Sequence, residues 1–249
     1  MTVPESPYIE EKGYASRFTH GKKTLMRGTE ARCLAEFGSE DEWLRCIKDE
    51  FPQYLPFLKK RCRLQFRGRI LEIGAGAAWL SAELSKLPNV VQVVATDFSP
   101  KLLKEQAPRI FRLLKASSGK ITRTPADFHQ LHFADGTFDF VVCASALHDA
   151  VSIVRVLKEA ARVLKPGGKF VAIREPVRPL LKSAARTARK RPDGVGKRLY
   201  TLAEYRGFFS QAGLKLETQR VNLSSGFKYY FNEAVNGLTH ARYALVATK

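Results

Sequence analysis

The residues best suited to chemistry begin with a glycine pair at the end of a short apolar run, in the stretch ILEIGAGAAWL. Gly74 and Gly76 allow a sharp turn and a close approach of the backbone to a ligand, because glycine has no Cβ and adopts positive φ. A helical pattern follows, and the amides at a helix N-terminus suit anionic or hydrogen-bond-accepting groups. The stretch therefore predicts a strand, a glycine turn and a helix beside a ligand site.

Two carboxylates follow at the ends of the next predicted strands. Asp97 ends the run VVATD, where it can accept hydrogen bonds from both hydroxyls of a ribose. Asp127 follows the third predicted strand, where it can accept from an adenine amino group, with Phe128 flanking the base. In an open sheet these strand ends lie side by side, so the set predicts a nucleoside cofactor.

The glycine turn favours one nucleoside cofactor over another. A dinucleotide motif has a third glycine three residues after the second, where this chain has Trp79. Glu72 adds a negative charge close to the turn, which disfavours a pyrophosphate and suits a ligand with an amino group and a sulfonium. We therefore expect S-adenosylmethionine rather than NAD.

The elements that must position these residues alternate between strand and helix from Arg69 onward. Expected strands are Ile70–Ile73, Val90–Thr96, Lys120–Thr124, Phe138–Ala144, Lys169–Arg174, Lys215–Leu223 and Arg242–Thr248. Expected helices are Trp79–Leu87, Pro100–Lys115, Val151–Leu164 and one that begins at Thr201 and runs to Ala212. Continuous apolar strands that alternate with helices predict a parallel sheet covered on both faces, with its ligand beyond the carboxyl ends of the strands.

Four segments resemble the successive motifs of class I S-adenosylmethionine-dependent methyltransferases, close to the methyltransferase type 11 group: ILEIGAGAAWLSAEL, VVATDFSP, PADFHQLHFADGTFDFVVCASALHD and EAARVLKPGGKFVAIREP. The resemblance implies an α/β, Rossmann-like, doubly wound seven-stranded sheet, mostly parallel with an antiparallel last strand. The residues before the sheet themselves predict two or three helices, with Ser39 and Glu42 in a capping-box pattern, so we expect an N-terminal arm and helical cap over residues 1–68. The methyltransferase domain would cover residues 69–249, with a basic insertion at 175–200.

The same resemblance implies cofactor-binding roles for particular residues. The methionine part would be lined by Glu72, Gly74, Ala75 and Gly76. The ribose and adenine would be held by Asp97, Phe98, Asp127 and Phe128, and Ala144 and Ser145 would pass under the sulfonium. Ala77 and Ala78 replace the glycine that often ends the first motif, which tightens the turn without excluding the cofactor.

A base for methyl transfer is harder to assign. His148 follows the fourth expected strand, where the acceptor should lie, and a near-neutral pKa is typical of histidine. It is the candidate catalytic residue, and the alternative is that it only packs beside the site. Further candidates for the pocket are Tyr14, His20, Glu175, Tyr200, Tyr229 and Tyr230.

The amino-acid composition indicates which kinds of partner the protein can bind. The formal net charge is +18 at pH 7, and Arg178, Lys182 and Arg186 repeat at helical spacing after Glu175. This stripe predicts an anionic acceptor, RNA or an anionic surface as a partner, and the alternative is a solvated helix face without a partner. Four scattered cysteines, without a CxxC pair, indicate reduced thiols in a cytoplasmic protein with no zinc site. No apolar run reaches transmembrane length.

We therefore expect a cytoplasmic S-adenosylmethionine-dependent methyltransferase that acts on a small-molecule acceptor, which can be anionic. The helical cap and the aromatic segments could enclose such a molecule. One alternative is an RNA or protein methyltransferase, because of the basic charge. The other is a catalytically inactive module that binds S-adenosylmethionine.

Overall fold

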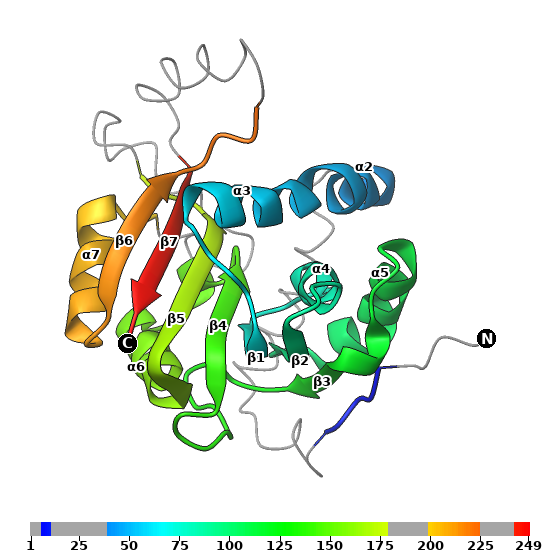
Figure 1. The fold of residues 1–249 in the computed structure, drawn as a ribbon, viewed down its shortest axis with the longest axis horizontal. Helices are drawn as coiled ribbons and strands as arrows, with labels where there is room; N and C mark the ends of the chain where they lie inside the picture. The colour runs from blue at the N-terminus through cyan, green and yellow to red at the C-terminus, as the bar shows by residue number, and fades with distance from the viewer. Residues whose placement is uncertain (1–5, 11–38, 179–198, 225–241) are drawn as a thin grey trace.

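A seven-stranded sheet with strand order β3-β2-β1-β4-β5-β7-β6 forms the centre of the computed structural model, which describes residues 6–10, 39–178, 199–224 and 242–249 (Figure 1). The strands are β1 (Gly68–Ile73), β2 (Val90–Asp97), β3 (Ile121–Pro125), β4 (Phe138–Ala144), β5 (Leu164–Glu175), β6 (Lys215–Arg220) and β7 (Tyr243–Thr248). β7 runs antiparallel to β5 and β6, whereas the other neighbouring strands pair in parallel. This arrangement confirms the predicted fold class.

Helical elements precede the sheet and connect its strands. They are α2 (Glu40–Arg45), η2 (Cys46–Glu50), η3 (Phe51–Gln53), α3 (Tyr54–Arg61), α4 (Trp79–Ser85), η4 (Leu102–Gln106), α5 (Ala107–Leu113), η5 (Ser118–Lys120), η6 (Leu147–Asp149), α6 (Ile153–Val163) and α7 (Leu202–Gln211). Hydroxyl side chains begin three of them: Ser39, Ser152 and Thr201 each accept a backbone N–H in the first turn. Thr201 and Glu204 form the full reciprocal cap that stabilises a helix start.

The sheet buries a separate apolar core on each face, because successive side chains of a strand point to opposite sides. Ile70 of β1 packs with the helical cap, α4 and α5. Leu71, the next residue, packs on the other side with α6 and α7. Figure 1 shows the corresponding helix pairs on opposite sides of the sheet. Both layers are thus anchored in the same central strands.

Two expected elements differ from the structure. The helix expected over Pro100–Lys115 is divided into the wider turn η4 and the α-helix α5, and the N–H of Ala107 bonds back to the carbonyl of Leu102. Pro108 lacks the N–H that a regular helix would use here, which explains the division. The strand expected over Lys169–Arg174 begins earlier, at Leu164, so β5 includes Lys165–Gly168, with a register shift against β4.

The chain order of the strands reverses between β1 and β4, which pair in parallel at the centre of the sheet. In open α/β sheets, ligands bind beyond the carboxyl ends of the strands at such a reversal. The glycine turn after β1 and the loop after β4 meet at this point.

Candidate functional site

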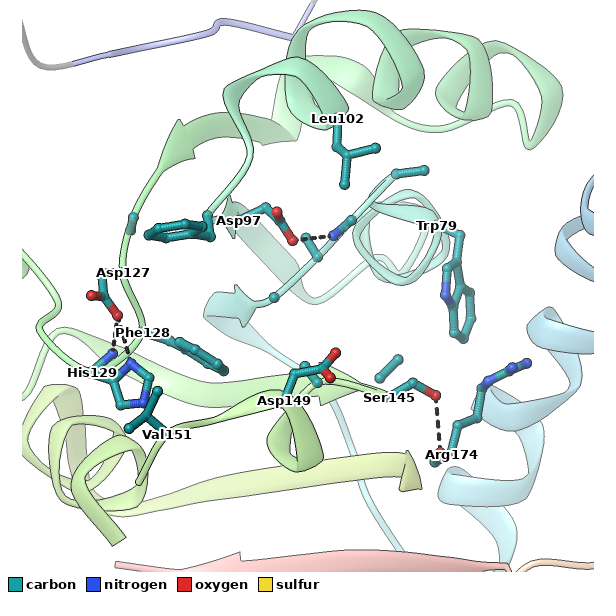
Figure 2. Close-up of a pocket in the computed structure, with 18 of the residues that line it drawn as sticks. Trp79, Asp97, Leu102, Asp127, Phe128, His129, Ser145, Asp149, Val151 and Arg174 are labelled. Carbon is teal, nitrogen blue, oxygen red and sulfur yellow. Dashed lines mark hydrogen bonds and ion pairs between the residues drawn. The ribbon is translucent and has the colours of Figure 1, made fainter. Parts of the chain in front are cut away.

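A cavity of about 420 Å³ opens at the carboxyl ends of the central strands (Figure 2). Nine of the ten predicted cofactor residues line it: Gly74, Ala75, Gly76, Asp97, Phe98, Asp127, Phe128, Ala144 and Ser145. The helical cap adds an apolar wall made of Trp43, Ile47 and Phe51. The structure therefore brings the predicted set together in one place and adds side chains from a second layer.

The glycine turn has a geometry that side chains would disturb. Gly74 and Gly76 have φ values of 62° and 54°. A Cβ on Gly74 would lie 2.6 Å from the Cβ of Ala146, which is closer than real side chains pack. Ala78 also adopts positive φ, at 57°, where the family motif often has glycine. At Gly74 and Gly76 the backbone itself therefore lines the cavity, with no Cβ between it and the open space.

Asp97 connects the glycine turn to the end of β2. Its Oδ2 accepts the N–H of Gly76 at 2.7 Å, and its Oδ1 accepts the N–H of Ser99 at 2.8 Å. The side chain is buried at 4% exposure, yet it lines the cavity. An ionised carboxylate offers about four acceptor positions, so it can hold the turn and also accept ligand hydroxyls.

Glu72 lies beneath the glycine turn and is not among the residues that line the cavity. Its Oε2 accepts the backbone N–H of Ser81 at 2.8 Å and also the Ser81 hydroxyl. Burial raises the pKa of Glu72 to about 8, although the bonds from Ser81 oppose this shift. Glu72 therefore fixes the start of α4 against β1, and at neutral pH it is largely protonated.

The loop after β3 forms the opposite wall. Oδ1 of Asp127 accepts the backbone N–H of His129 at 2.9 Å and faces the ring Nδ1 of His129 at 2.8 Å. The Nε2 of His129 accepts the N–H of Ser152 at 3.4 Å, so the proton sits on Nδ1. Phe98 and Phe128 line the same part of the cavity. This wall joins an acceptor group to aromatic rings, as an adenine site requires.

His148, the predicted catalytic residue, is 8% exposed and is not among the cavity-lining residues. Its Nδ1 lies 3.0 Å from Oε2 of Glu175, a carboxylate that also accepts the backbone N–H groups of Ala146 and Leu147. Asp149, one residue further, lines the cavity, and its carboxylate points toward the open space in Figure 2. Oδ1 of Asp149 is 3.9 Å from Nε2 of His148.

Arg174 lines the cavity beside the helical cap. It follows the buried run of β5 with a φ of 60°, and its guanidinium carbon lies 3.7 Å from the ring centroid of Phe51. Phe51 in turn packs on Trp79, with ring centroids 4.9 Å apart. Sequence patterns did not single out Arg174, His129 or Asp149, because only the paired strands and the folded cap show that they face one cavity.

Other predicted candidates have separate locations. Glu175 is buried and contacts the loop after β4, as described above. Tyr200 packs edge-on against Tyr205 and Phe208. Arg178 contacts Glu204 at 3.5 Å. The remaining candidates lie outside the described residues: Tyr14, His20, Lys182, Arg186, Tyr229 and Tyr230.

None of the described helices combines the length and the apolar character that crossing a bilayer requires. No group of three or more metal-ligating side chains occurs within the described part of the chain.

Comparison with known proteins finds a matching domain family for the central part of the chain. Residues 71–172 match the family described as Methyltransferase domain. The chain is 31% identical over 118 residues to the ubiquinone/menaquinone biosynthesis C-methyltransferase UbiE of Geobacter sp. (strain M21), covering 47% of this chain and 49% of that protein. A second such protein, from Geotalea daltonii, is 28% identical over 141 residues, with 56% of this chain and 54% of that protein covered. The chain thus spans about half the length of the curated relatives it matches.

Solved structures show the same fold at low identity. An S-adenosylmethionine-dependent methyltransferase from Mesorhizobium loti has a TM-score of 0.61 at 20% identity, covering 81% of this chain and 99% of that chain. The [4+2]-cyclase SpnF has a TM-score of 0.59 at 16% identity, covering 99% of this chain and 98% of that chain. The motifs, the strand order and the match over residues 71–172 together show a methyltransferase domain with the class I fold in this part of the chain. They agree with the sequence resemblance, whose methyl donor is S-adenosylmethionine.

Proposed function

We propose that the protein transfers a methyl group from S-adenosylmethionine to a small-molecule acceptor that has an apolar body and an anionic group. The observation that carries this proposal is the acceptor side of the cavity, where Arg174 lies against the aromatic wall of the cap. A guanidinium stacked on an aromatic ring binds an oxyanion while keeping an apolar molecule in contact with the wall. The relatives named as C-methyltransferases favour carbon as the accepting atom.

The cofactor side is assigned to the predicted residues. Asp97 would accept the ribose hydroxyls, and the loop of Asp127 and Phe128 would bind the adenine. The glycine turn would lie along the methionine part, since a Cβ on Gly74 would already meet Ala146 at 2.6 Å. S-Adenosylmethionine, when bound, supplies a methyl group on a positively charged sulfur.

Asp149 is the carboxylate that we assign as the base of this reaction, in place of His148. Its side chain is 31% exposed and lines the cavity, whereas that of His148 is 6% exposed. Asp149 would remove a proton from a hydroxyl group of the acceptor molecule. The acceptor is left with an oxyanion, which donates electron density to the atom that receives the methyl group. Glu175 fixes the His148 ring, which in turn limits the positions of Asp149.

Asp149→Asn should lower kcat by about 10²-fold or more, the usual contribution of a general base, and leave the affinity for S-adenosylhomocysteine unchanged. Asp41→Asn, a change of the same chemistry at an exposed position of α2, serves as the control. A kcat for Asp149→Asn close to that of the control would remove Asp149 from the reaction.

The acceptor class is tested by transfer of a labelled methyl group to a fractionated cell extract. We expect the label in an anionic small-molecule fraction, and Arg174→Gln should raise KM for that acceptor about tenfold or more. Label in RNA or protein would favour the macromolecular alternative. Binding of S-adenosylmethionine with no label in any fraction would favour the inactive module, and calorimetric preference for NAD would defeat the proposal.

A further inference from the structure

A second cavity, of about 230 Å³, lies at the other edge of the sheet, where the parallel strands begin. Its walls come from the segment before β1, the start of β4 and the start of β5, and its cationic lining residues are Arg63, Arg67, Lys165 and Lys169. The strand β1 separates this edge from the glycine turn by six residues, or about 20 Å at ~3.3 Å per residue. The second cavity is therefore remote from the proposed methyl-transfer site.

The segment between α3 and β1 carries several exposed arginines. Leu64 and Phe66 are buried at 2% and 7% exposure and pack into the core. The residues between and around them are exposed: Arg61, Arg63, Gln65, Arg67 and Arg69. Leu64 and Phe66 hold this segment against the core, and Arg63 and Arg67 line the second cavity. Lys59 and Lys60, at the end of α3, continue the exposed cationic row.

Positive side chains outnumber negative ones among the described lining residues of the second cavity. Asp139 is the one carboxylate among its described lining residues, and both of its oxygens lie 2.9 Å from Nζ of Lys165. Burial works against ionisation of Asp139, but Lys165, the Arg69 N–H and the nearby Arg67 lower its pKa overall. Lys169 donates to the Thr248 hydroxyl at 3.0 Å. One lysine thus neutralises the carboxylate, and the exposed Arg63 and Arg67 dominate the opening.

We propose that this basic cleft, formed by Arg63, Arg67, Lys165 and Lys169 with the row Lys59–Arg69, binds the phosphodiester backbone of a nucleic acid. The row extends beyond the cavity, which favours an extended polyanion over a single small anion. Guanidinium groups bind phosphate oxygens in pairs. Of the exposed large apolar residues of the described chain, Val91 lies beside the row, since Gly68 pairs with Val90 and Arg69 with Gln92. The others, Ile9, Leu113 and Val151, lie outside the row and the cavity, and a single valine offers little apolar surface to a lipid layer.

The cleft is suited to the backbone rather than to bases. Phe140, the one aromatic residue among its described lining residues, is buried at 6% exposure and offers no stacking surface. Binding through phosphate contacts is independent of base sequence and weakens steeply with salt, because bound cations are released from the nucleic acid. RNA binding here would be separate from the methyl acceptor, which we place in the first cavity.

The test measures binding of the full-length protein to a labelled 20-nucleotide RNA by fluorescence anisotropy between 50 and 200 mM salt. R63Q/R67Q should weaken binding about tenfold at low salt and reduce the slope of log K against log salt by about 1.4, at ~0.7 per lost phosphate contact. K158Q/R206Q removes the same charge from exposed positions of α6 and α7 and should leave the slope unchanged. R63K/R67K, which keeps the charge, should retain most of the affinity.

Affinity for S-adenosylhomocysteine, measured on the same variants, should be unchanged and shows that they are folded. On the wild-type protein, RNA should protect Arg63 and Arg67, and not Arg206, from phenylglyoxal, as read by mass spectrometry. Equal RNA binding by R63Q/R67Q and K158Q/R206Q, or unprotected Arg63 and Arg67, would overturn the proposal. Anionic vesicles that bind this row more tightly than RNA, or millimolar phosphate that displaces RNA completely, would overturn it as well.

Discussion

Glu72 is the residue at which burial and charge are most directly opposed. Its carboxyl group is 1% exposed, and burial raises its pKa to about 8 despite two hydrogen bonds from Ser81. In the unfolded chain a glutamate loses its proton near pH 4.5, the ordinary value. Between these two pH values the folded state holds a proton that the unfolded state has released, so rising pH favours unfolding.

Glu72→Gln should remove this pH dependence, because an amide stays neutral and its oxygen can still accept the Ser81 N–H. Below about pH 4.5 the stability difference between wild type and variant should be constant. From there to pH 8 the wild type should lose stability relative to the variant, with a slope of up to about 1.4 kcal/mol per pH unit. Urea unfolding at several pH values measures the effect, and parallel curves for the two proteins would show that Glu72 is ionised when folded.

The neighbouring residues His148 and Asp149 show where prediction from sequence reaches its limit. The sequence indicates that both follow the fourth strand and therefore lie near the acceptor. Which of them faces the cavity depends on Glu175, which comes from β5 and holds the His148 ring on the buried side. Such a contact between residues distant in the chain has no local signal. Asp97 and the glycine turn were predictable because each ends its own strand.

At the scale of elements, the turn between β1 and α4 determines how closely a ligand can approach the sheet. Gly74 combines a positive φ of 62° with a close neighbour, since a Cβ there would meet Ala146 at 2.6 Å. Gly136 has the same φ, 62°, but a Cβ there would meet nothing within 4 Å. The pair therefore separates the effect of backbone conformation from the effect of crowding.

Gly136→Ala should cost about 1–2 kcal/mol of stability, the usual penalty for a left-handed alanine, and leave cofactor affinity unchanged. Gly74→Ala should cost more, because the loops after β1 and β4 must move apart, and it should weaken binding of S-adenosylhomocysteine at least tenfold. Chemical denaturation and titration calorimetry measure the two effects. Equal losses of stability in both variants, with normal cofactor affinity, would show that the loops tolerate the added methyl group.

The order and type of the helices and strands were largely predictable from the sequence, and the residues at which they begin and end were less so. Alternating apolar strands and helices indicate a parallel sheet, and the family resemblance supplies the antiparallel last strand, here β7. The interruption of the helix after β2 has a visible cause in Pro108, but the sequence pattern of apolar residues continues through it. The start of β5 depends on pairing of Leu164 with Phe138, which local sequence does not indicate.

At the scale of the whole molecule, the helical cap and the sheet share one core. The buried cap residues Trp43 and Phe51 belong to the same apolar cluster as Ile70 of β1 and Val93 of β2. The boundary proposed between residues 68 and 69 therefore divides the sequence into an appendage and a domain, but it crosses a continuous packed layer. We expect the two parts to unfold together, because neither can lose its partner without exposing a core.

The two tryptophans of the chain allow this to be tested, because Trp43 lies in α2 of the cap and Trp79 begins α4 on the sheet. In Trp43→Phe and Trp79→Phe the remaining tryptophan reports on one part alone. Within each variant its fluorescence transition in urea should coincide with the far-ultraviolet circular dichroism transition. S-Adenosylhomocysteine at about 100 times its Kd should stabilise the molecule by about 2.7 kcal/mol in both signals. If the Trp43 signal instead changed at a lower urea concentration, and only the Trp79 signal shifted with ligand, the cap would be a separate unit that closes over a preformed cofactor site.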